Sequence, residues 1–151
     1  FFDTLEWTYP MLARAYLTRL RDAGSDAPKW LGKARKAVRR GLKLVKRHSN
    51  YVPAAYLNQA LLDWAEGRRD DAAAAFDRSI EAAQKQGSFL MLAETHLEAG
   101  RCWVRDDPKR ARRHLQLALD LFEDRGMEPD ALRCRELIDD AGGLTGEVTV
   151  P

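Results

Sequence analysis

PAAYLNQALLDWAEGRRDDAAAAFDRSIEAAQKQ, residues 53–86, is the stretch that decides the fold. It contains two amphipathic runs with apolar residues at the three- and four-residue spacing of a helix face. The only break between them is Glu66-Gly67-Arg68, where glycine suits a tight turn. The stretch therefore predicts a helical hairpin, with one helix over residues 53–66 and a second over residues 70–86.

The rest of the chain predicts further helices of the same kind. Alanine, leucine, arginine and glutamate dominate, and β-branched residues are sparse before Val148. Glycines and the Asp107-Pro108 pair provide stop and start signals between the helical runs. Ser88 is an expected N-cap, and Gly142-Gly143 is expected to end the last helix before a tail at 142–151. The additional helices are expected over residues 1–22, 28–48, 89–105, 108–125 and 129–140. The first is expected to carry Leu5 on its apolar face, and the last is expected to bury Leu132, Leu137 and Ile138.

The second helix of each expected hairpin repeats one pattern of small, large and small residues. The nine positions are Ala34, Val38 and Gly41, then Ala72, Phe76 and Ser79, then Ala111, Leu115 and Ala118. Successive copies are 38 and 39 residues apart, and a period in this range is typical of helical solenoids. The small residues let two helices approach closely, and the large residue fills the core between neighbouring hairpins.

With this register, residues 5–125 resemble the tetratricopeptide repeat (TPR) family. The matching first-helix positions are Tyr9, Leu12, Ala13 and Tyr16, then Tyr56 and Ala60, then His96, Ala99, Gly100 and Trp103. Gly67 matches the glycine of the turn between helices. The resemblance implies an all-α, right-handed solenoid of αα-hairpins, with three hairpins and a C-terminal capping helix in one domain, residues 1–141.

The chain departs from the TPR pattern at several places. The first hairpin has an inserted turn at 24–28, Gln59 replaces a large apolar residue, Trp64 comes one place late, and the period exceeds the usual ~34 residues. Such loose repeats resemble the C-terminal regions of bacterial multidomain signalling ATPases and kinases, where they follow a nucleotide-binding module.

Composition limits the class of protein and its expected location. Hydrophobic residues make up 45% of the 151 residues and charged residues 32%, which is typical of a water-soluble globular chain. The chain begins with Phe1 and is interpreted as a fragment or processed product. No signal peptide pattern or membrane-length apolar run is found, so we expect a cytoplasmic protein. Cys102 and Cys134 are interpreted as reduced thiols, with a disulfide or reactive thiol as the alternative.

The motifs of catalysis and cofactor binding are missing from the sequence. There is no GxxxxGK[ST], GxGxxG, HExxH, CxxC or EF-hand loop, so we expect no enzyme, no cofactor and no metal. His96 lies near Glu94 and Glu98 on one expected helix, which leaves an acid/base pair as one interpretation. An ordinary half-buried repeat residue is the other.

The TPR resemblance implies a concave groove lined by the first helix of each hairpin. The residues at the matching positions are Met11, Arg14, Thr18, Leu57, Asn58, Leu61, Glu94, Leu97, Glu98, Arg101 and Arg105, with Trp7 also expected there. Asn58 stands where some family members bind a peptide backbone or C-terminal carboxylate. The resemblance predicts a non-catalytic, scaffold-like interaction or regulatory module that binds a peptide, a helix or a neighbouring domain of the same longer chain.

Residues 28–48 are the electrostatic exception. They contain nine Lys/Arg and no Asp/Glu, whereas the remaining residues contain 16 basic and 23 acidic residues, a net charge of −7. The candidate basic patch consists of Arg35, Lys36, Arg39, Arg40, Lys43 and Arg47. Three interpretations stay open: a solvated face paired with acidic groups of its own neighbours or of another domain, a nucleic-acid or polyanion site, and a site for an acidic protein.

Overall fold

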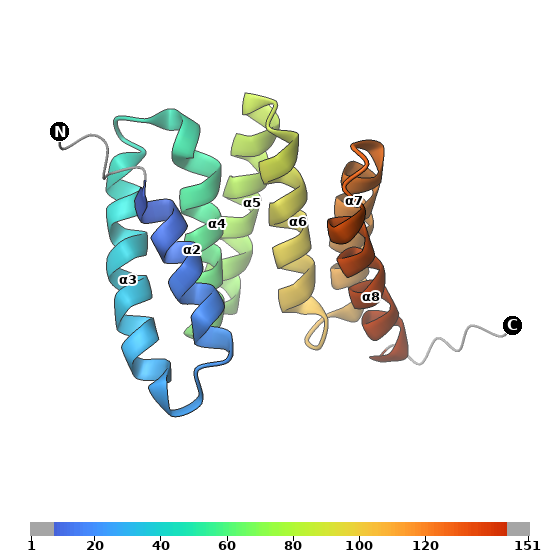
Figure 1. The fold of residues 1–151 in the computed structure, drawn as a ribbon, viewed down its shortest axis with the longest axis horizontal. Helices are drawn as coiled ribbons and strands as arrows, with labels where there is room; N and C mark the ends of the chain where they lie inside the picture. The colour runs from blue at the N-terminus through green and yellow to red at the C-terminus, as the bar shows by residue number, and fades with distance from the viewer. Residues whose placement is uncertain (1–7, 145–151) are drawn as a thin grey trace, which may run out of the picture. The chain divides into compact units, whose positions relative to one another are not determined.

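Seven α-helices form the part of the chain that the computed structural model describes, residues 8–144, and these residues contain no strand. The expected all-helical class is therefore confirmed (Figure 1). The helices are α2 (Thr8–Arg21), α3 (Ala27–Leu44), α4 (Val52–Ala65), α5 (Arg69–Gln86), α6 (Phe89–Trp103), α7 (Pro108–Asp124) and α8 (Glu128–Leu144). Leu5 and Trp7, which we expected on the first helix, lie outside the described residues.

The helix ends follow from capping chemistry. The Ser88 hydroxyl accepts a hydrogen bond from the Met91 amide at 3.4 Å, and the Asp107 carboxylate accepts one from the Arg110 amide at 3.0 Å. Both residues are therefore the N-caps that we expected. The chain turns at Gly67 between α4 and α5, where φ is +80°, a backbone conformation that residues with a Cβ rarely adopt.

The chain divides into two units, Phe1–Gln86 and Gly87–Pro151. In the first unit α2 packs against α3, and α4 packs against α5 (Figure 1). Helix α4 also contacts α2 and α3, which joins the two hairpins. A buried polar contact supports this junction, because the Asn58 amide donates a 2.9 Å hydrogen bond to the Pro10 carbonyl and the buried amide is thereby paired.

The second unit contains α6, α7 and α8, with α7 in contact with both of its neighbours. Gly100 on α6 lies so close to α7 that a Cβ at this position would come 2.5 Å from Cγ of Leu115. Gly100 is thus required by close helix packing and not by a turn. Gly100 is at a first-helix position where the TPR resemblance implies a small residue.

The register of small, large and small residues is buried in all three hairpins. Eight of the nine residues are at most 3% exposed, the highest value being that of Val38, and the ninth, Gly41, is also buried. Ser79 is 0% exposed, and its hydroxyl donates a 2.8 Å hydrogen bond to the Pro53 carbonyl, so the one polar member of the register is satisfied. That these hairpins form a right-handed solenoid, in one domain over 1–141, stays a prediction.

Two expectations about α8 are wrong. The helix continues through Gly142 and Gly143 to Leu144, where we expected it to end before a tail. Neither glycine has the positive φ that terminates a helix. Leu132, which we expected to be buried, is 52% exposed, whereas the small side chains of Ala131 and Cys134 fill the buried face. Residues 145–151 of the expected tail lie outside the described residues.

Candidate functional site

Helix α3 carries an exposed row of cations along one side. The row follows the three- and four-residue spacing that keeps side chains on one helix face. We name these residues the basic stripe: Lys29, Lys33, Lys36, Arg40, Lys43 and Arg47, the last in the turn after α3. From Lys29 to Lys43 the stripe extends about 21 Å along the helix axis. It includes four of the six residues of the predicted basic patch and adds Lys29 and Lys33, while Arg35 and Arg39 lie off it.

Aromatic rings lie beneath several of these cations. The Arg40 guanidinium is 5.0 Å from the Tyr9 ring centroid, and its Nη1 donates a 2.7 Å hydrogen bond to the Tyr9 hydroxyl. Lys33 Nζ is 5.7 Å from the Tyr16 ring and 5.1 Å from the Trp30 ring. Each contact contributes about 0.5–1 kcal/mol at an exposed site and restricts where the cation lies.

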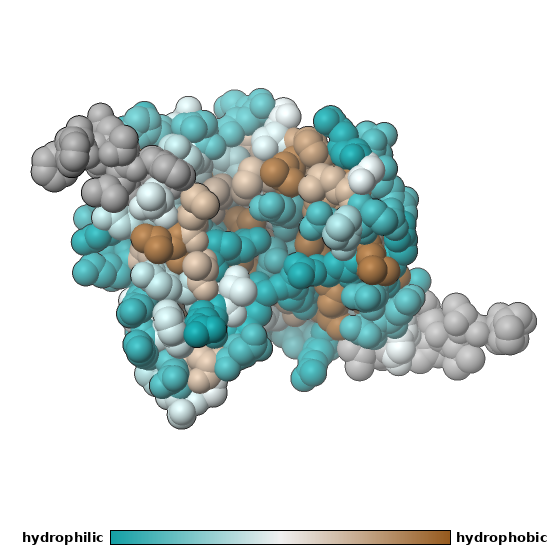
Figure 2. Space-filling model, in the orientation of Figure 1, coloured by the Kyte–Doolittle hydropathy of each residue, from teal (hydrophilic) through white to brown (hydrophobic). Residues whose placement is uncertain are grey.

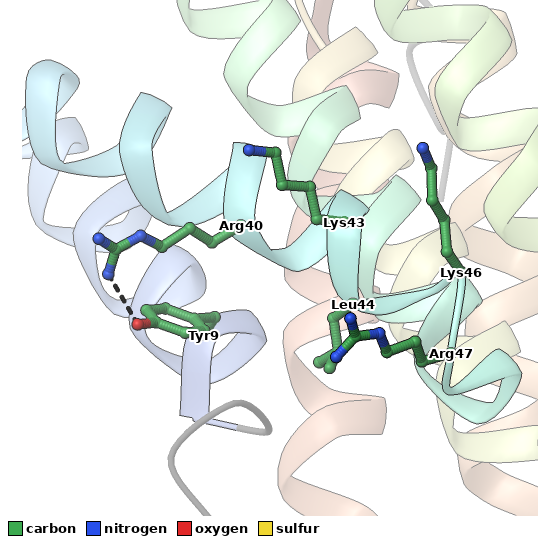
Figure 3. A pocket seen from close by; sticks show the side chains of 6 residues that line it. All are labelled: Tyr9, Arg40, Lys43, Leu44, Lys46 and Arg47. Atoms are coloured by element: carbon green, nitrogen blue, oxygen red, sulfur yellow. Dashed lines mark hydrogen bonds between the residues drawn. The ribbon is translucent and has the colours of Figure 1, made fainter. Parts of the chain in front are cut away.

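Two hollows border the stripe within the first unit. The larger, of about 570 Å³, is lined by Tyr9, Arg40, Lys43, Leu44, Lys46 and Arg47 (Figure 3). Figure 3 shows Tyr9 entering from α2 and the cations from α3 and the turn after it. The smaller hollow, of about 290 Å³, shares Tyr9 and Arg40 and extends along Tyr16, Lys33 and Lys36. The described lining of both hollows contains no acidic residue.

The structure tests whether the basic residues pair with acidic groups of their own neighbours. Arg35 does so, because its Nη2 lies 2.7 Å from the Glu66 carboxylate. This hydrogen bond to Arg35, followed by the one to Arg68, holds the pKa of Glu66 below its usual value. Within residues 8–144, Lys36, Arg39, Lys43 and Arg47 form no ion pair. Self-pairing therefore accounts for one residue of the predicted basic patch.

The predicted groove residues fall into three classes of exposure. Met11, Thr18 and Arg105 are exposed, and Arg14, Glu94 and Arg101 are half-buried. Buried at 2–6% exposure are Leu57, Asn58, Leu61, Leu97 and Glu98. The Nδ2 group of Asn58 is used in the bond to Pro10. Asn58 therefore has a structural role here, and the ability to contact a ligand rests with the more exposed members. Trp7 lies outside the described residues.

The second unit contains a contact that the sequence reasoning missed, between His96 on α6 and His114 on α7. Their Nδ1 atoms are 3.0 Å apart, and one ring donates to the other according to tautomer. Burial lowers the pKa of both imidazoles to about 4, with the charge of His114 adding to the effect at His96 and those of Arg110 and Arg113 at His114. Both rings are therefore neutral at pH 7, and the pair is a packed hydrogen-bonded contact.

We expect this histidine pair to make the second unit sensitive to acid. The folded pKa of each ring, about 4, lies below the unfolded value of about 6.5, so the unfolded chain binds more protons between these limits. The stability that depends on the two neutral rings is fully present above about pH 7, and it declines as the pH falls toward 4. After allowance for solvent screening, the loss is on the order of 3 kcal/mol for the pair.

Urea denaturation at pH 7 and pH 5 measures this loss. In the double variant His96→Gln with His114→Gln, the free energy of unfolding should change less between the two pH values than in the wild type. The exposed-position variant His48→Gln should show the same change as the wild type. An identical slope in the double variant and the wild type would contradict the assignment.

The two cysteines differ in burial. Both are free, with Cys102 half-buried and Cys134 buried. Burial raises the pKa of the Cys134 thiol to about 11, which keeps it protonated and a poor nucleophile at neutral pH.

Two features are absent from residues 8–144. This part of the chain has no group of three or more His, Cys, Asp or Glu side chains arranged to hold a metal ion. None of its helices combines the length and the apolarity that crossing a lipid bilayer requires. On the face shown in Figure 2, hydrophilic side chains dominate and hydrophobic ones form small separate patches. Comparison of the chain with protein-family models, curated proteins and solved structures finds no match.

Proposed function

We propose that this chain is a non-catalytic binding module built from TPR-like helical hairpins, with α8 as a cap. The observation that supports the proposal most strongly is the burial of the same small, large and small register in three hairpins. The TPR resemblance implies that the second helix of each hairpin packs and that the first helix faces a partner, and stacked repeats in general form extended binding surfaces. The partner would be a protein segment or another domain of the same longer chain. A cytoplasmic, bacterial signalling ATPase or kinase as the parent protein belongs to the same proposal.

The groove part of this proposal rests on the exposed residues. Met11 is 64% exposed on α2, and Thr18 is exposed two turns later on the same helix. Because Leu57, Asn58 and Leu61 of α4 are buried, a partner in this part of the groove would chiefly contact these exposed residues of α2.

Chemical crosslinking in cell extract tests the groove. The tagged chain should crosslink to a discrete protein, and Met11→Glu with Thr18→Glu should abolish that product, because two new charges would have to be desolvated in the interface. Leu117→Glu with Gln116→Glu, at exposed positions of α7, is the matched control and should leave the product intact. Equal crosslinking of all three chains, or none above background, would refute the groove.

A second candidate function is polyanion or nucleic-acid binding through the basic helix, residues 28–48. The specific observation in its favour is that Lys36, Arg39, Lys43 and Arg47 form no ion pair with the described residues while two of them line the larger hollow. Binding at such a site releases the counterions that surround the polyanion, and added salt opposes that release. The affinity therefore falls steeply as salt rises from about 50 mM to about 200 mM.

A further inference from the structure

We propose that the basic stripe and the larger hollow beside Tyr9 bind an acidic protein segment, rich in Asp and Glu side chains. The inference rests on the proposed function and deepens it by naming the chemistry of the partner and the face that receives it. It differs from the groove in position, because it uses α3 and the turn after it.

Part of the charge of the stripe is unpaired within the described residues. Two acidic side chains of the first unit are already used, because Asp63 accepts from Arg68 while Glu66 pairs with both Arg35 and Arg68. Lys36 and Lys43 are left without an ion-pair partner in residues 8–144. Successive cations of the stripe are three or four residues apart, and like charges at that spacing on one helix repel one another by a few tenths of a kcal/mol per pair. An acidic partner removes that repulsion and adds attraction.

The larger hollow has a size and a lining that suit a carboxylate group. Its volume of about 570 Å³ is in the range of sites that hold a compact ligand group. Arg40, Lys43, Lys46 and Arg47 line it together with Leu44, and the Tyr9 hydroxyl accepts a hydrogen bond from Arg40 (Figure 3). A carboxylate side chain inserted there would meet several donors, and the guanidinium of Arg47 offers the fork geometry that carboxylates prefer.

The aromatic rings beside the stripe favour carboxylates over nucleic-acid bases as its ligands. Proteins that bind single-stranded nucleic acid use free aromatic faces on which bases stack. Here the rings of Tyr9, Tyr16 and Trp30 already lie under cations of the same unit. The rings therefore orient the cations, and a partner that needs only anionic groups fits better than one that needs stacking platforms. This ordering also reduces the side-chain entropy that binding would cost.

Fluorescence anisotropy with three labelled probes of equal length tests the proposal: an oligoglutamate peptide, an oligoglutamine peptide and an oligothymidine. Oligoglutamate should bind the chain at about 50 mM salt and weaken toward about 200 mM, and it should bind more tightly than oligothymidine. Oligoglutamine should not bind. Lys36→Glu, Lys43→Glu and Arg47→Glu together should weaken oligoglutamate binding by about tenfold or more.

The matched control reverses three exposed cations of the second unit, Lys109→Glu, Arg113→Glu and Arg133→Glu, which change the net charge equally. The control should bind oligoglutamate more tightly than the stripe variant, and both variants should melt cooperatively with helical circular dichroism. Equal weakening by both variants would reduce the effect to net charge and overturn the proposal. Tighter, stripe-dependent binding of oligothymidine, or no binding of oligoglutamate, would also overturn it. The groove test uses other residues and another readout, so either proposal can fail alone.

Discussion

Replacement of Gly100 by alanine will destabilise the second unit by at least about 2 kcal/mol, although alanine is the better helix former. The added Cβ would come 2.5 Å from Cγ and 2.7 Å from Cδ2 of Leu115, and 3.2 Å from the Ala111 carbonyl oxygen. Cγ of Leu115 is close to the α7 backbone and moves less easily than a terminal methyl group. The two helices must therefore separate or Leu115 must leave its rotamer.

Gly32→Ala is the matched control, because Gly32 lies in mid-α3 with nothing within 4 Å of an added Cβ. It should stabilise the chain by about 0.5–1 kcal/mol, so the two substitutions have opposite signs. In the double variant Gly100→Ala with Leu115→Ala, the loss should be smaller than the sum of the single losses. Urea denaturation curves of the four variants, Leu115→Ala among them, give these values, and a neutral Gly100→Ala would show that α6 and α7 are not in close contact.

Replacement of Phe76 by alanine will cost about 3–5 kcal/mol in the first unit. Phe76 is 1% exposed and is the large residue of the register, between Ala72 and Ser79, both 0% exposed. Alanine would leave a cavity that the neighbouring small residues have no side-chain length to fill. The transfer free energy of the ring and the lost packing contacts add together.

The control for Phe76→Ala is Leu132→Ala, which removes a large apolar side chain that is 52% exposed. That change should cost less than about 1 kcal/mol. The urea midpoint of each variant, with the slope held to the wild-type value, gives the comparison. A cost below about 1 kcal/mol for Phe76→Ala would remove the argument that the register marks the core.

The sequence predicted the helices and the register well because these depend on local chemistry. Gly67, Ser88 and Asp107 mark turns and caps through their own backbone and side-chain preferences. The end of α8 was missed for a related reason. Gly142 and Gly143 permit a helix to end but do not force it, and here the helix continues.

The candidate surface was harder to predict because it depends on side chains from separate helices. The cations of α3 were visible in the sequence, but their position over Tyr9 and Tyr16 follows from the packing of α2 against α3. Asn58 was expected in a groove, but its side chain donates a hydrogen bond to Pro10, which lies 48 positions away in the sequence. His96 and His114 are on different helices of one hairpin, and the hairpin register, with His114 next to Leu115, was the available signal.

The measurement that most directly tests the binding account is an NMR titration of the ¹⁵N-labelled chain with the oligoglutamate peptide. The account predicts that the largest shift changes fall on the turn after α3 and on the stripe, at Lys36, Lys43 and Arg47, and on Tyr9 of α2. Resonances of the groove residues Met11 and Thr18, and those of α7, should stay near their free positions. Shift changes centred on Met11 and Thr18, or spread evenly over the exposed cations of both units, would contradict it.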